Sequence, residues 1–201
     1  MTRIADQEAL RIIERLGVVR PRDLEAHGMP RARIYRMLRK GLVRREGRGL
    51  YVAAEHPYTS EYTLAQVAKR VPQAVVCLLS ALQFHQITTQ VPHEVWIALP
   101  EKARIPRLDY PKVRVVRFSE AMLNYGVVDH EIAGVLVRIT SPARTVVDCF
   151  RYRNKVGLDV AIEALRDAVQ SRKAKVDEIL RAAEVGRARN VIRPYLEALT
   201  S

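Results

Sequence analysis

The sequence predicts an α+β protein with an N-terminal winged helix-turn-helix domain, followed by a larger α+β domain with a helical C-terminal tail. Helix, turn, helix, glycine stop and hairpin patterns follow one another in order within the first 55 residues. Several later segments alternate apolar and polar residues as strands do, and helical periodicity prevails beyond residue 142. We therefore expect two domains, residues 1–57 and 58–201, with a short polar connection around residues 56–61.

The first domain begins with two helices whose ends are marked by individual residues. Asp6 suits the start of a helix with apolar residues at helical spacing up to Leu16, after which Gly17 supplies a stop. Pro21 favours the first turn of a second helix over residues 21–26, and Gly28 provides the following turn. Val18 and Val19 between the helices predict a short strand.

A third helix, opened by Pro30 and ended by Gly41, leads into a short hairpin that turns at Gly47 and Gly49. Residues 31–48 contain eight Lys or Arg against one acid, Glu46, which gives a local charge of +7. With 100° per residue, Met37 and Leu38 lie on the side of Ile34, whereas the cationic residues gather on the outer side. This unit predicts binding to double-stranded DNA.

The expected DNA contacts divide between the third helix and the wing. The start of a recognition helix enters the major groove, where the fork of an arginine side chain bonds guanine bidentately. Residues further along the helix and on the wing are expected to meet phosphates or the neighbouring minor groove. The predicted DNA-binding residues are Arg31, Arg33, Tyr35, Arg36, Arg39, Lys40, Arg44, Arg45 and Arg48.

Charge and composition agree with a nucleic-acid partner. The 201 residues carry a formal net charge of +12. Residues 1–60 account for +6 of it, so the charge density is more than twice as high there as in the remainder. Only two cysteines occur, Cys77 and Cys149, outside any metal-binding spacing, and we expect both to be small apolar core residues. With no long apolar run and no secretory leader pattern, the expected compartment is the cytoplasm and no membrane contact is expected.

The second domain is predicted from patterns of both periods. Strands are expected at residues 94–99, 113–118, 127–132 and 135–139, and residues 74–79 fit either a strand or a buried helix start. Helices are expected at 64–71, 80–84, 142–150, 159–170, 176–185 and 189–199.

No residue pattern in the second domain predicts catalysis. Five residues are of the types that form metal or acid–base sites, but none has a helical ligand spacing; they are His85, His93, Asp129, His130 and Glu131. Phosphate-cradling glycine loops and nucleophile elbows are also missing from the sequence. We therefore expect no catalytic residue, no metal and no cofactor, and a protein that is not an enzyme.

Several blocks of sequence resemble the AbiEi-like antitoxins of bacterial type IV toxin–antitoxin (abortive infection) systems. They are the N-terminal block at residues 8–52, then LLSALQFHQI, EVWIALP, VRVVRF and, most specifically, ITSPARTVVDCF at residues 139–150. The resemblance implies a repressor whose winged helix binds an inverted repeat in its own promoter. Because one winged helix has a small footprint on DNA, we also expect two copies to bind there and to pair on the DNA. The resemblance also implies a C-terminal domain that neutralises a cognate nucleotidyltransferase-like toxin.

Some interpretations of the sequence compete. Arg144 and Asp148, four residues apart, suit an internal ion pair beneath a helix begun by Ser141 and Pro142, or else a contact with a partner. The basic cluster from Lys102 to Arg117 suits an extended DNA footprint, an acidic partner surface or a solvated loop. Two alternatives to an antitoxin are a winged-helix regulator with a ligand-sensing second domain and no toxin, and an endonuclease-like DNA enzyme.

Overall fold

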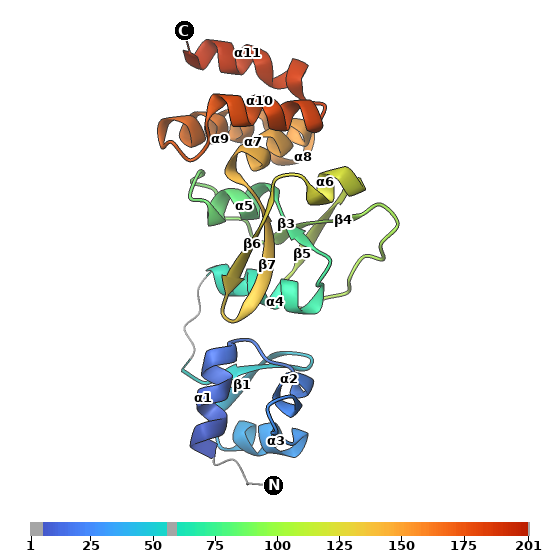
Figure 1. The fold of residues 1–201 in the computed structure, drawn as a ribbon, viewed down its shortest axis with the longest axis vertical. Coiled ribbons are helices and arrows are strands. Elements are labelled where there is room, and N and C mark those ends of the chain that lie inside the picture. Colours follow the sequence, from blue (N-terminus) through green and yellow to red (C-terminus); the bar gives the residue numbers. More distant parts are fainter. Residues whose placement is uncertain (1–5, 56–59, 201) are drawn as a thin grey trace. The chain divides into compact units, whose positions relative to one another are not determined.

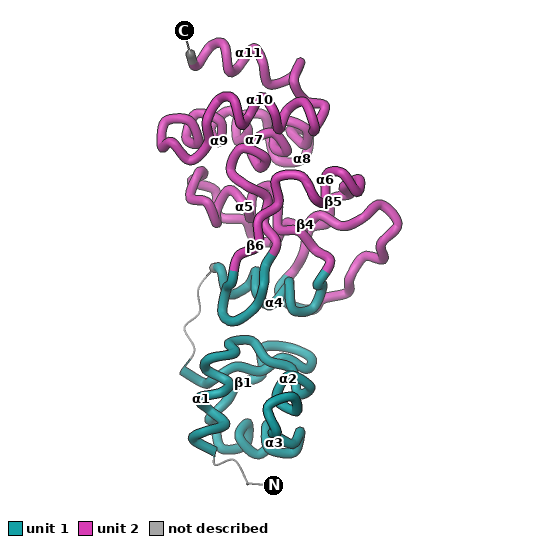
Figure 2. Tube along the Cα trace, viewed as in Figure 1, with its two compact units in different colours: residues 1–72, 109–111, 131–137 teal, residues 73–108, 112–130, 138–201 magenta. Residues whose placement is uncertain are grey.

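The structure is a computed structural model that describes residues 6–55 and 60–200. It has the predicted α+β architecture and divides into two compact units (Figure 2). The first unit comprises residues 1–72, 109–111 and 131–137, and the second comprises residues 73–108, 112–130 and 138–201. The expected connection at residues 56–59, including the boundary at residue 57, lies outside the described residues, and the first compact unit extends beyond that boundary through a further helix.

The N-terminal part of the first unit has the order expected of a winged helix-turn-helix (Figure 1). Its elements are α1 (Asp6–Leu16), α2 (Pro21–Glu25), α3 (Arg31–Arg39), β1 (Val43–Gly47) and β2 (Leu50–Ala53). Gly28 has a φ of +72°, which lets the chain turn sharply between α2 and α3. The strands β1 and β2 pair antiparallel, with Arg44 opposite Val52, and Val19 forms an isolated bridge with Tyr51.

One apolar core holds these elements together. A single cluster draws residues that are at most 3% exposed from four of the elements: Ile13 of α1, Ile34 and Met37 of α3, Val43 of β1 and Tyr51 of β2. Because Ile34 and Met37 lie three residues apart, they form one stripe of α3 that faces this core. The opposite face of α3 is thereby turned outward.

The remaining elements build a five-stranded sheet and a group of helices. They are α4 (Ser60–Arg70), β3 (Val75–Val76), α5 (Leu78–Phe84), β4 (Val95–Pro100), β5 (Val113–Phe118), α6 (Glu120–Asn124), β6 (Val127–Ile132), β7 (Val135–Thr140), α7 (Pro142–Arg151), α8 (Arg153–Val156), α9 (Leu158–Gln170), α10 (Val176–Val185) and α11 (Arg189–Thr200). The strand order is β5-β4-β3-β7-β6, in which β3 runs antiparallel to β4 and parallel to β7, and β4 runs parallel to β5.

Helix α7 is central to the second unit. It contacts α5, α8, α9, α10 and α11, and Figure 1 shows α7 to α11 gathered together. Val146, Val147 and Phe150 of α7 are fully buried in the main core, as expected from their spacing. The buried segment 74–79, left open between strand and helix, divides into the short β3 and the start of α5.

Candidate nucleic-acid interface and the buried C-terminal motif

The outward face of α3 carries four of the eight cations predicted to bind DNA. Arg31, Tyr35, Arg39 and Lys40 are exposed and Arg36 is partly exposed. Tyr35 is 50% exposed, and its ring meets that of Tyr51 edge-on with centroids 6.3 Å apart. The structure therefore leaves five of the six predicted helix residues accessible.

Arg33 differs from this expectation. Its side chain is only 8% exposed, although helical angles grouped it with the outer cations. The reason is that Arg33 precedes Ile34 by one residue, so it lies at the border of the buried stripe, and its Nη1 reaches Asp6 Oδ1 of α1 at 3.3 Å.

Asp6 also contacts two further cations of α3. Arg36 Nη2 lies 3.1 Å from Asp6 Oδ1, and Lys40 Nζ lies 2.7 Å from Oδ2. The hydrogen bond from Lys40 lowers the pKa of Asp6, burial opposes this shift, and Arg36 adds to the lowering. The sequence indicated Asp6 only as a helix start, because nothing local connects it with residues 27 to 34 positions away.

The other predicted DNA-binding cations differ in whether their side chains have ion-pair or hydrogen-bond partners within the described residues. Arg31 forms an ion pair with Glu25 of α2, with Nε 2.8 Å from Oε1. Within residues 6–55 and 60–200, Arg39 and Arg48 have no side-chain hydrogen bond or ion pair. On the wing, Arg44 Nε contacts Glu46 Oε1 at 2.6 Å, and exposed Arg45 donates to the carbonyl oxygen of Gly47 at 3.1 Å.

The Ser-Pro-Ala-Arg-Thr segment forms the start of α7, and its last three residues are buried. Ser141 precedes α7 and Pro142 takes its first position, as expected, although the Ser141 hydroxyl makes no capping bond. Arg144 is 1% exposed; its Nε donates to Asp148 Oδ1 at 2.9 Å, Nη1 to the carbonyl of Tyr125 at 2.7 Å and Nη2 to that of Met122 at 3.1 Å. Of the two interpretations, the internal ion pair is the one that the structure contains.

Asp148 lies inside the core beside its partner. It is 0% exposed, and its Oδ2 atom has no hydrogen-bond partner among the described residues. Burial raises the pKa of Asp148 to about 6, and the nearby Arg144 opposes the rise. Cys77 and Cys149 are buried as predicted, and burial raises the pKa of both thiols.

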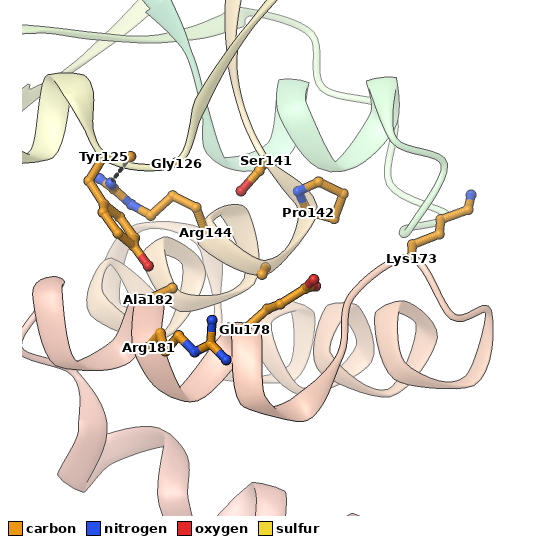
Figure 3. A pocket seen from close by; sticks show the side chains of 10 residues that line it. Tyr125, Gly126, Ser141, Pro142, Arg144, Lys173, Glu178, Arg181 and Ala182 are labelled. Atoms are coloured by element: carbon orange, nitrogen blue, oxygen red, sulfur yellow. Dashed lines mark hydrogen bonds between the residues drawn. The ribbon is translucent and has the colours of Figure 1, made fainter.

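A pocket of about 360 Å³ opens at the start of α7 (Figure 3). Figure 3 shows Arg144 reaching along one wall to the carbonyl of Tyr125. The other charged lining groups are engaged within the chain: Arg181 pairs with Asp177 at 2.9 Å, Lys173 donates to the carbonyls of His85 and Gln86, and Glu178 accepts from the backbone of Lys175. Each of these charged groups therefore already has a hydrogen-bond or ion-pair partner within the chain.

Of the candidate metal or acid–base residues, His85 and His130 lie near each other, with ring centroids 6.3 Å apart. Among residues 6–55 and 60–200, no three His, Cys, Asp or Glu side chains are grouped so that they would hold a metal ion. In the basic cluster, Arg114 lies over the Trp96 ring, 4.8 Å from its centroid, and Arg117 donates to the carbonyl of Pro100 at 2.7 Å. Every helix in the described part of the chain is too short or too polar to cross a membrane.

The chain resembles known proteins in both sequence and fold. No curated protein matches the sequence significantly. The crystal structure of the RV2827C protein from Mycobacterium tuberculosis has a similar fold, with a TM-score of 0.59 and 16% sequence identity over 93% of this chain and 75% of that one. Residues 7–54 match the model "Transcriptional regulator, AbiEi antitoxin", and residues 74–196 match the model of the AbiEi antitoxin C-terminal domain. Because these two matches cover nearly the whole chain, the protein belongs to the AbiEi antitoxin family of transcriptional regulators.

Proposed function

We propose that the protein is a sequence-specific repressor of its own operon and the antitoxin of a type IV toxin–antitoxin system, whose partner is a nucleotidyltransferase-like toxin. The observation that carries the DNA-binding part is the outward cationic face of α3, fixed by the buried stripe of Ile34 and Met37. A recognition helix with exposed arginines beside a basic wing suits the major groove and its flanking phosphates.

Within this interface the residues have different roles. Arg31 and Arg36, with Tyr35 at the flank, read base edges from the start and middle of α3. Arg39 and Lys40 at the end of α3, with Arg44, Arg45 and Arg48 on the wing, bind phosphates or the minor groove. Arg33 contributes from inside by packing α3 against α1, since little of it is accessible.

The DNA-binding proposal is tested by titrating the purified protein with a duplex from its upstream region. Arg36→Ala should cost about 1 to 3 kcal/mol and relax preference at one base position, whereas Arg45→Ala should weaken all duplexes alike and flatten the salt dependence. Arg11→Ala removes the same charge from an exposed position of α1 and serves as the control. If Arg36→Ala binds the operator as tightly as the control, α3 is not the recognition helix.

The antitoxin proposal rests on the family and on the separate second unit. The gene beside this one is co-expressed with the full chain, either as the parent or with Arg36→Ala and Arg39→Ala combined. We expect both forms to restore growth equally, because the substitutions lie in the DNA module and leave the second unit unchanged. Operator binding with no restoration of growth by the parent would favour a regulator without a toxin.

A further inference from the structure

One carboxylate, that of Asp6, lies among three cations of the recognition helix. Its Oδ1 accepts from Arg33 Nη1 at 3.3 Å and from Arg36 Nη2 at 3.1 Å, and its Oδ2 accepts from Lys40 Nζ at 2.7 Å. Arg33, Arg36 and Lys40 occupy successive turns of one side of α3, so a single acid on α1 engages that side along its length.

This contact is specific to Asp6. The Asp6 side chain is only 22% exposed, whereas Glu8 and Glu14 of the same helix are exposed and form no ion pair within the described residues. Arg36 and Lys40 remain 42% and 54% exposed while they contact Asp6, so both are accessible to DNA at the same time as they are held. Asp6 is therefore a fixed anion at the edge of an open cationic surface.

A fixed anion at this place has two opposite effects on DNA binding. It offsets one positive charge, which reduces the number of phosphates that the surface neutralises and so weakens binding to any duplex. It also restricts long side chains before DNA arrives, which lowers the entropy that they lose when they bind a base edge. The first effect acts on all sequences, and the second helps only where the held geometry fits the bases.

We propose that Asp6 is a positioning residue that sets the protein's discrimination between its operator and other DNA by holding Arg36 and Lys40 in place, while its charge lowers the affinity for all DNA. This inference rests on the proposed DNA-binding function. Arg39 shows the contrast on the same helix: it is exposed, with no side-chain partner in the described part of the chain, and so is free to follow any phosphate.

The test uses the full chain with Asp6→Asn, which removes the charge while keeping the size of the side chain. Affinities are measured for the operator duplex and for a scrambled duplex of equal length and composition, over a range of salt concentrations. Glu8→Gln removes one negative charge from an exposed position of the same helix and is the matched control.

We expect Asp6→Asn to bind the scrambled duplex more tightly and to show a salt slope steeper by about 0.9, as one further phosphate contact would produce. The ratio of operator to scrambled affinity should fall by about tenfold, the upper end for releasing one ordered side chain. Glu8→Gln should leave this ratio at the parent value.

Equal ratios for Asp6→Asn and Glu8→Gln would overturn the inference, since only the net charge would then matter. A parent that shows no operator preference would instead overturn the proposed function, and the inference with it. Asp6→Glu covers the case in which loss of the Arg33 contact unfolds the Asn variant, as judged by circular dichroism. It keeps the charge but moves the carboxylate, so it should retain the parent salt slope with a reduced ratio, and an unchanged ratio in this variant also overturns the inference.

Discussion

Arg144→Met is expected to destabilise the second unit strongly at pH 8. The substitution replaces the stem of the side chain with an unbranched apolar one but removes the donors to Asp148 and to the carbonyls of Tyr125 and Met122. Breaking a buried ion pair by removing one partner typically costs about 3 to 5 kcal/mol, because the other charge is left uncompensated. That is a large part of the roughly 5 to 15 kcal/mol by which a domain is stable.

The loss of stability caused by Arg144→Met should depend on pH, and the sign of this dependence follows from the pKa of Asp148. Its pKa of about 6 lies above the ordinary value of 3.8, so the native state binds more protons than the unfolded state between these two values. The stabilising contribution of this carboxyl is therefore fully present below pH 3.8 and is lost as the pH rises through about 6. Arg144 opposes the rise in pKa, so Arg144→Met raises it further and extends the loss to higher pH.

Urea denaturation at pH 5 and pH 8, followed by tryptophan fluorescence, measures this effect. Trp96 is the single tryptophan and is 3% exposed in β4, so its signal reports on the second unit. At pH 5 the loss of stability should come only from the carbonyls of Tyr125 and Met122, which are left without their donor, and should be about 1 to 3 kcal/mol. The double variant Arg144→Met/Asp148→Leu should recover stability at pH 8, because no buried charge remains. A single variant that is as stable as the parent at pH 8, or that loses equally at both pH values, would refute the reasoning.

Two further predictions concern the turn beside Arg144 and the assembly on DNA. Gly126→Ala should lower the urea midpoint by more than Gly41→Ala. Both residues have positive φ, which alone costs an alanine about 1 to 2 kcal/mol, but of the two only Gly126 would place a Cβ 3.0 Å from another atom, the Cβ of Arg144. Equal losses of stability in the two variants would contradict this explanation. The operator should be an inverted repeat occupied by two protomers, because one winged helix buries only about 600 to 1,000 Å² on DNA. Footprinting combined with sedimentation tests this, and one protein molecule on one unrepeated site would disprove it.

Much of the fold follows from periodicity in the sequence. The strand β5 and the helix α10 have the predicted bounds, because each is a regular segment with an apolar pattern and clear ends. The short helices α6 (Glu120–Asn124) and α8 (Arg153–Val156) were not predicted, since five and four residues are too few for a helical pattern to appear. They form because their neighbours hold them in place; Tyr152 at the start of α8, for example, donates from its hydroxyl to the carbonyl of Arg117.

The candidate DNA interface was predictable in its location but not in its internal arrangement. The pattern of α3 places Arg36, Arg39 and Lys40 outside correctly. It also placed Arg33 there, since an angle of 100° from Ile34 does not decide between a border position and an exposed one. The partner that draws Arg33 inward is Asp6, 27 residues earlier. Such contacts depend on how α1 packs against α3, and no local pattern contains that information.

Acids from outside residues 31–48 reduce the positive charge of the basic unit. Counted along residues 31–48 the unit carries +7, with Glu46 as its one acid. In the fold, Asp6 and Glu25 join it through their ion pairs with α3, which reduces the charge of the assembled surface to +5. The cations that remain without such partners in the described residues include Arg39 on α3 and Arg48 on the wing. A surface of this kind attracts phosphates less strongly, because acids offset part of its charge, but its side chains are more ordered before they bind. A regulator that must find one site among many others gains more from that exchange than from charge alone, because occupancy of its site depends on the ratio of operator to non-operator affinity.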